Sequence, residues 1–226
     1  MNNLSFKSLG IDPHFPGMLD LTLLRDYIES IDHSIEALTE RYTEKELIRY
    51  GDYDDPCEVN YIYQVADGYL PNAVKMPLVV TAYTCLESSI EQLLNYAKEK
   101  EGKAKSYKDV EGKSSVNKYQ KYITNELKLN FKFKEEVKSN ISDMNKFRNC
   151  IAHANGNLKH WPDNKVQELK LISERLNGKY DTDIYVGYDL RISTAFLKWC
   201  LDVTNNSVKP LEDCLKQRYK LRPYHM

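Results

Sequence analysis

Apolar side chains recur every three or four residues along most of this chain, which is the spacing that places them on one face of an α-helix. The first such run consists of Leu21, Leu24, Ile28, Ile31, Ile35 and Leu38. Further helices are expected at about 71–100, 116–127, 134–152, 163–176 and 193–215. This periodicity predicts an all-α fold, a helical bundle with a long N-terminal helix and at most one short extended segment.

Two interruptions are expected in the first third of the chain. The sequence Thr43-Glu44-Lys45-Glu46 resembles a capping box, which predicts that the helix restarts there and runs to about Tyr50. A stretch rich in Asp, Pro and Gly follows and predicts a loop that reaches Gly68.

Turn signals also divide the last third. Asn177-Gly178 predicts a turn, and the β-prone residues 183–188 predict an extended segment. Ser193 is a suitable N-cap for the final helix. Pro210 lacks a backbone N–H, so an interruption or kink is expected around Asn205-Asn206.

The length of 226 residues favours a single domain, 1–226. We expect residues 1–70 to form an N-terminal helical extension and 71–226 to form the helical core. The longest apolar stretch, 76–83, is too short to cross a membrane. The first residues lack the basic and apolar regions of a signal peptide, so we expect a cytoplasmic protein with no membrane partner.

Charge is distributed unevenly along the chain although the net charge is only -1. Residues 1–60 hold thirteen acidic and five basic side chains, whereas residues 98–138 hold twelve lysines and seven acids. The lysine-rich stretch has two interpretations. It follows an RNA backbone, with its aromatic residues as stacking platforms, or it is a solvated face whose aromatics turn to the core. The second is the more common arrangement.

A short polar motif stands at the end of the helix predicted at 134–152. Arg148 and Asn149 are followed by His153, and then by Asn155-Gly156, a pair typical of a helix stop. An arginine supplies a permanent cation for a phosphate, and an imidazole titrates near neutral pH and can move protons. These residue types suit the binding and cleavage of a phosphodiester.

Helix geometry restricts how the motif residues meet. Arg148 and His153 are five residues apart, which separates them by about 140° around a straight helix and about 7–8 Å along it. Two arrangements bring them together. The helix ends near Ala152 and lets His153 swing across, or two copies of the motif meet across a dimer axis.

Structural roles are the alternatives to a catalytic one. His153 suits a C-terminal cap that interacts with the helix dipole, and Arg148 suits a buried ion pair with an acid such as Glu87. Cys150 lies within the motif, but we expect it to be a core thiol because it points to another side of the helix. The other four cysteines show no paired spacing and are also expected to be reduced core thiols.

The stretch from Leu78 to Gly156, together with the final helix from Ser193, resembles the HEPN superfamily. The resemblance rests on the helix segment 83–93, the glycine-bearing linker after it, the motif Arg148-Asn149 to His153, and a closing helix from Ser193. It implies a HEPN-like helical bundle and a metal-independent endoribonuclease whose active site forms at a homodimer interface. Such a protein acts as a toxin or a phage-defence effector. One departure from some toxins of the family is Asn155, which stands where they carry a tyrosine.

The resemblance implies roles for particular residues. Arg148, Asn149 and His153 are the expected catalytic residues, with RNA as the substrate and with no cofactor or metal. Four residues beside the motif are candidates for RNA contact, namely Lys146, Asn155, Lys159 and His160. Solvent exposure without a role is the alternative for the two lysines and His160, and a helix stop is the alternative for Asn155. An antitoxin or another defence-system protein is the further expected partner. A catalytically inactive HEPN-like module that binds RNA or protein is the alternative, and a nucleotide-sensing domain is a third.

Overall fold

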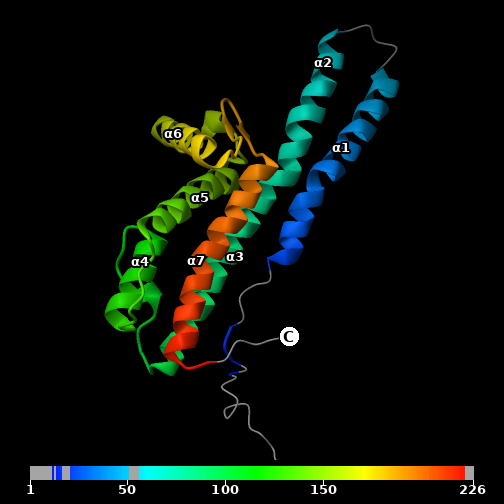
Figure 1. Cartoon of the computed structure of the whole chain (residues 1–226). Helices are drawn as coiled ribbons and strands as arrows, with labels where there is room; N and C mark the ends of the chain where they lie inside the picture. Colours follow the sequence, from blue (N-terminus) through cyan, green and yellow to red (C-terminus); the bar gives the residue numbers. More distant parts are fainter. Residues whose placement is uncertain (1–11, 13, 17–20, 51–55, 222–226) are drawn as a thin grey trace, which may run out of the picture. The chain divides into compact units, whose positions relative to one another are not determined.

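The computed structural model describes residues 12, 14–16, 21–50 and 56–221. The α-helices of the described residues are α1 (Thr22–Tyr50), α2 (Pro56–Gln64), α3 (Leu70–Lys100), α4 (Ser115–Lys121), α5 (Glu135–Ala154), α6 (Asp163–Tyr180) and α7 (Thr194–Arg218). Two strands, β1 (Tyr185–Val186) and β2 (Leu190–Arg191), pair antiparallel. The all-α prediction is therefore confirmed, and the expected extended segment is this small hairpin (Figure 1).

The residues fall into two compact units. Unit 1 takes its described residues from 1–19, 84–142 and 202–226, and unit 2 takes its own from 20–83 and 143–201. Helices α3, α5 and α7 each contribute residues to both units. The motif at Arg148 belongs to unit 2, as do α1, α2 and the β-hairpin.

In unit 2, α1 is one continuous helix of 29 residues (Figure 1). The predicted restart at Thr43 is wrong, because Thr43 and Glu46 lie in the interior of the helix, where no N-cap is needed. Both side chains are half-buried, as are their neighbours Tyr42 and Leu47. The inward face of α1 therefore continues through the predicted boundary.

The loop predicted up to Gly68 is also wrong in its described part. Residues 56–64 form α2, and a π-helical turn, η2 (Val65–Tyr69), joins α2 to α3. Gly68 lies within that turn and not in a loop. Ile62 and Ala66, four residues apart, are buried on one face of this segment. Residues 51–55 lie outside the described part of the chain.

The core of unit 2 near the motif is aromatic. Phe147 from α5 contacts Phe196 from α7, with ring centroids 5.0 Å apart, and Phe196 stacks on Trp199 at 5.3 Å. Asp143, which is buried in α5, forms an ion pair with Arg175 of α6. Apolar packing and this ion pair together hold α5 against α6 and α7.

Helix α6 continues through the predicted turn at Asn177-Gly178 and ends at Tyr180. Asn177 does not break the helix, because its side chain bonds the segment that follows. Its Oδ1 accepts from the backbone N–H of Ile184 at 2.9 Å and its Nδ2 donates to the Ile184 carbonyl at 2.9 Å. The turn occurs later, at Asp181, which adopts a left-handed conformation with φ of 51°.

Helix α7 begins as predicted, because the Ser193 hydroxyl accepts from the backbone N–H of Phe196 at 3.0 Å. The predicted interruption at Asn205-Asn206 is wrong, since α7 runs unbroken from Thr194 to Arg218 with Pro210 inside it. Apolar burial on both sides of Pro210, at Val208 and Leu211, outweighs the loss of one backbone hydrogen bond.

In unit 1 the aromatic residues of the lysine-rich stretch are core residues. Tyr107, Tyr119, Tyr122 and Phe133 are buried, and Phe131 is half-buried. The Tyr122 hydroxyl donates to the Lys105 carbonyl at 2.8 Å. These rings are therefore not stacking platforms, and the solvated-face interpretation is confirmed for them.

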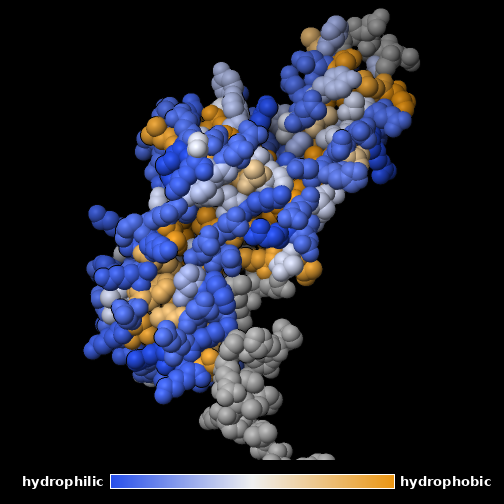
Figure 2. Space-filling model, viewed as in Figure 1, coloured by the Kyte–Doolittle hydropathy of each residue, from blue (hydrophilic) through white to orange (hydrophobic). Residues whose placement is uncertain are grey.

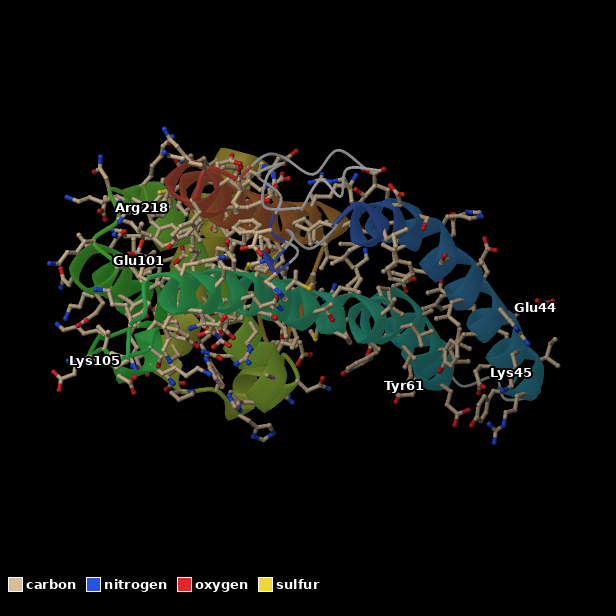
Figure 3. The ribbon with its side chains drawn as sticks, turned by 90° about the horizontal axis from the view of Figure 1, so that it is seen from below. Glu44, Lys45, Tyr61, Glu101, Lys105 and Arg218 are labelled. Carbon is tan, nitrogen blue, oxygen red and sulfur yellow. The ribbon has the colours of Figure 1, made fainter. Side chains whose placement is uncertain are left out.

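Unit 1 also contains a polar cluster around the end of α3. Asp12 pairs with Lys100 at 2.5 Å and accepts from the Tyr96 hydroxyl at 2.8 Å. Glu101 pairs with Arg218 at 3.2 Å, and both are labelled in Figure 3. Within the described residues of either unit, no helix is both long enough and apolar enough to cross a membrane.

Candidate functional site

The motif occupies the last two turns of α5, a helix that ends at Ala154. Cys150 and Ile151 face the core, and the preceding side chains Arg148 and Asn149 are half-buried. His153 is exposed and remains within the helix. The expectation that the helix ends near Ala152 and frees His153 is therefore wrong.

Arg148 is held by two neighbours. Its guanidinium carbon lies 5.6 Å from the centre of the buried Tyr83 ring, and its Nη1 donates to Asn149 Oδ1 at 2.8 Å. The Nε atom is buried and makes no hydrogen bond. Within the described residues of unit 2 no carboxylate pairs with Arg148, and Glu87 belongs to the other unit. The arginine therefore keeps its positive charge uncompensated by an acid in this unit.

Asn149 links the arginine to the histidine. It accepts the arginine hydrogen bond, and it lies one helical turn before His153, on the same face of α5. Arg148 and His153 themselves are on sides of the helix about 140° apart. A single chain therefore gives an Arg148–Asn149 pair with His153 next to it, but it does not place Arg148 and His153 on one side of the helix.

Two left-handed residues stop α5, as the sequence predicts. Asn155 has φ of 50° and Gly156 has φ of 72°. A Cβ atom on Gly156 would lie 2.4 Å from the Met76 Cε atom, so this position requires glycine for space as well as for conformation. The stop directs the chain away from the helix axis after Ala154, one residue beyond His153.

The loop after the stop is bonded to the β-hairpin. The Leu190 N–H donates to the Gly156 carbonyl at 2.9 Å, and the Leu158 N–H donates to the Tyr188 carbonyl at 3.1 Å. Asn72 of α3 binds both sides of β2, accepting from the Ile192 N–H and donating to the Leu190 carbonyl, each at 3.1 Å. The hairpin is thereby fixed beside the motif.

This surface combines exposed aromatic rings with cations. Lys159 Nζ lies 5.7 Å from the centre of the Tyr188 ring, and the Arg191 guanidinium lies 5.5 Å from that of Tyr185. Tyr188 and Tyr185 are 78% and 56% exposed. Rings and cations arranged in this way suit nucleobases and phosphates. We call these four residues the hairpin surface.

The four predicted RNA contacts differ in their availability. Lys159 and His160 are exposed in the short 3-10 helix η5 (Leu158–His160), and Asn155 is exposed at the helix stop. Lys146 is half-buried and engaged with Asp143 at 3.4 Å and with Glu168 at 3.0 Å. Lys146 therefore joins α5 to α6 through ion pairs, and these pairs would have to break before Lys146 could bind RNA.

The thiol of Cys150 has no exposed surface, and burial raises its pKa to about 11. The core-thiol interpretation of this residue is confirmed, and a nucleophilic role is excluded by inaccessibility. Among the other cysteines, Cys200 is buried and Cys57 is exposed, so the core interpretation is wrong for Cys57.

Comparison of the chain with protein-family models, curated proteins and solved structures gives no significant match. The site is therefore interpreted from its own residues. The sequence does not identify three residues that contribute to the site. Periodicity places Tyr83 only on the apolar face of its helix, and β-propensity places Tyr185 and Tyr188 only in an extended segment. A ring opposite Arg148 cannot be recognised from periodicity, because it requires the packing of α3 against α5.

Proposed function

We propose that this chain is a HEPN-type, metal-independent endoribonuclease that acts as a homodimer and serves as a toxin or phage-defence effector. The observation that carries the proposal is Arg148, a half-buried cation held by Asn149 and Tyr83 that pairs with no acid among the described residues of unit 2. Burying a guanidinium without a counter-ion costs free energy, and a bound anion such as an RNA phosphate would offset that cost. The exposed imidazole of His153 stands one turn from Asn149.

The proposed reaction is an internal transfer at phosphorus. His153 accepts the proton of a ribose 2'-hydroxyl, the O2'–P bond forms, and the P–O5' bond breaks. The partner's copy of the same histidine donates a proton to the leaving 5' oxygen. Arg148 neutralises the charge that develops on the phosphoryl oxygens. The products are a 2',3'-cyclic phosphate and a 5'-hydroxyl, and the sequence of steps requires no metal.

The hairpin surface supports an RNA substrate. It is bonded to the loop that follows His153 and presents two exposed tyrosines, each with a cation at its ring. Unpaired bases stack on such rings, while lysine and arginine contact the adjoining phosphates. This favours RNA over a free nucleotide, because the rings extend the surface beyond the reach of one phosphate group.

Induced expression in a bacterial host tests the proposal in cells. Wild-type protein should arrest growth, His153→Ala should not, and His14→Ala should arrest growth like wild type because His14 lies in the other unit. The variants must accumulate to the same level and keep the wild-type mass in solution. Equal toxicity of His153→Ala and wild type contradicts a catalytic role for His153. The alternative function is an inactive RNA-binding module. In that case wild type, His153→Ala and His14→Ala should all fail to arrest growth through RNA cleavage.

A further inference from the structure

Unit 2 contains a pocket between α1 and α2 that is built from residues the proposed nuclease does not use. Its volume is about 440 Å³, which is within the range of small-molecule pockets. Figure 2 shows hydrophilic residues beside apolar ones on these two helices. The wall of the pocket combines three tyrosines with two glutamates, namely Tyr42, Glu46 and Tyr50 of α1 and Glu58 and Tyr61 of α2.

The rings and Glu46 are close together in space. On α1, Tyr42, Glu46 and Tyr50 stand four residues apart, so they lie within an arc of about 80° around the helix. Burial raises the pKa of Tyr42, and electrostatic interaction with Glu46 and with the other two tyrosines raises it further. Tyr61, which is labelled in Figure 3, comes from α2 and is 61% exposed. The two helices therefore contribute rings to the same pocket.

Glu46 is the more buried of the two carboxylates. Its side chain is only 12% exposed, whereas Glu58 is exposed. Arg49 Nη1 lies 3.8 Å from Glu46 Oε2, which is beyond hydrogen-bond distance. Arg49 itself is 66% exposed, and its guanidinium carbon lies 5.3 Å from the centre of the Tyr50 ring. Glu46 thus receives no hydrogen bond from Arg49, and a cationic ligand with N–H groups would supply one.

These residue types select a cation with a hydrocarbon chain. The face of a tyrosine ring attracts cations and also packs against methylene groups. Two carboxylates on different helices favour a ligand with more than one positive charge. A quaternary ammonium has no N–H to donate to Glu46. Among the described residues, no cluster of three or more His, Cys, Asp or Glu could hold a metal ion.

We propose that the pocket between α1 and α2 binds a linear polyamine, an aliphatic chain that carries two or more ammonium groups. One ammonium donates to Glu46 and a second pairs with Glu58, while the tyrosine rings contact the methylene groups between them. The site rests on α1 and α2 alone. A protein without ribonuclease activity that binds polyamines would refute the nuclease and leave this site intact.

Calorimetric titration of the full chain with spermidine tests the ligand class. At pH 7 and about 0.15 M salt we expect saturable binding of one spermidine per chain, with a dissociation constant below about 100 μM. Butylamine carries one ammonium and choline carries no N–H on its nitrogen, so each should bind at least about tenfold more weakly. Absence of saturable spermidine binding, or equal binding of butylamine or choline, would overturn the proposal.

Glu46→Gln tests the carboxylate. It should raise the dissociation constant for spermidine by about tenfold or more, because the amide keeps the shape of the side chain and removes its charge. Glu44→Gln is the matched control. Glu44 is an exposed residue of α1 outside this pocket, labelled in Figure 3, and its loss should change the constant less than about twofold. Equal weakening by the two variants would assign binding to general negative charge and overturn the site.

Tyr61→Ala tests the rings and does not depend on whether Glu46→Gln folds, because Tyr61 is 61% exposed. It should weaken spermidine binding by about threefold or more. Tyr63→Ala removes another exposed ring from α2 that does not line this pocket, and it should leave binding unchanged. Circular dichroism melting checks that the variants are folded. Equal effects of the two tyrosine variants would contradict a polyamine site here.

Discussion

Arg148 Nη1 donates to Asn149 Oδ1 at 2.8 Å. The two residues are adjacent in sequence, so their side chains leave α5 in directions about 100° apart. The bond draws the guanidinium toward the helix face that also carries His153. Tyr83 supports it from α3 without neutralising it. A neutral amide thus positions the cation and leaves its charge available for a phosphate.

Asn149→Asp tests whether that charge is used. A carboxylate would accept the same hydrogen bond more strongly, but it would cancel the charge of Arg148. We expect RNA affinity to fall by about tenfold or more while thermal stability is kept or raised. Fluorescence anisotropy with a labelled oligonucleotide measures the affinity. Asn206→Asp, which makes the same charge change on an exposed position of α7, should have no effect on it.

Tyr188→Ala tests the hairpin surface. Loss of one stacking ring costs about 1–3 kcal/mol per base, so RNA binding by the His153→Ala protein should weaken about 5- to 150-fold. Tyr188→Trp should retain binding because it retains a ring. Tyr69→Ala removes a tyrosine that is 60% exposed elsewhere in unit 2 and should not weaken binding. Equal effects of Tyr188→Ala and Tyr69→Ala would exclude stacking on the hairpin surface.

Gly156→Ala tests the helix stop. The substitution introduces a side chain at φ of 72° and a Cβ atom 2.4 Å from Met76 Cε. We expect the free energy of unfolding to fall by about 2–3 kcal/mol in urea denaturation. Gly178→Ala is the matched control, because Gly178 lies within α6 with open space around its Cα. That variant should gain about 0.5–1 kcal/mol. Equal effects would show that the stop is not strained.

The Asp12 cluster predicts a pH dependence in unit 1. The hydrogen bond and charge of Lys100 lower the pKa of Asp12 to about 2, below the ordinary value of 3.8. The resulting stability is therefore fully present above about pH 4 and is lost as pH falls toward 2. Asp12→Asn should cost about 1–2 kcal/mol at pH 7, and the difference from wild type should shrink between pH 4 and pH 2. A difference that does not change with pH would contradict this pairing.

The sequence predicts the helices well where burial follows one periodic face. It fails where a local signal competes with packing. Thr43-Glu46 has the pattern of a capping box, yet the buried face of α1 continues past it. Asp67-Gly68 suggests a loop, yet a π-helical turn accommodates it beside the buried Ala66. Pro210 removes one hydrogen bond, and the apolar contacts around it keep α7 intact.

The sequence predicts the residue types of the site, but it predicts only part of how these residues are arranged in space. Arg148, Asn149 and His153 are contiguous on one helix, so a local pattern identifies them. Tyr83 and Tyr188 are far from them in sequence, and their roles depend on how α3 and the β-hairpin pack against the end of α5. Periodicity shows that such residues belong to an element, but it does not show which residue each one meets.

Cleavage of total cellular RNA by purified protein in EDTA tests the nuclease most directly, with wild type compared with His153→Ala and the fragment ends mapped. We predict that wild type alone produces fragments ending in 2',3'-cyclic phosphate and 5'-hydroxyl groups, and that His14→Ala matches wild type. Fragments of the same kind from His153→Ala, or no cleavage by a wild-type protein that arrests growth in cells, would contradict the account.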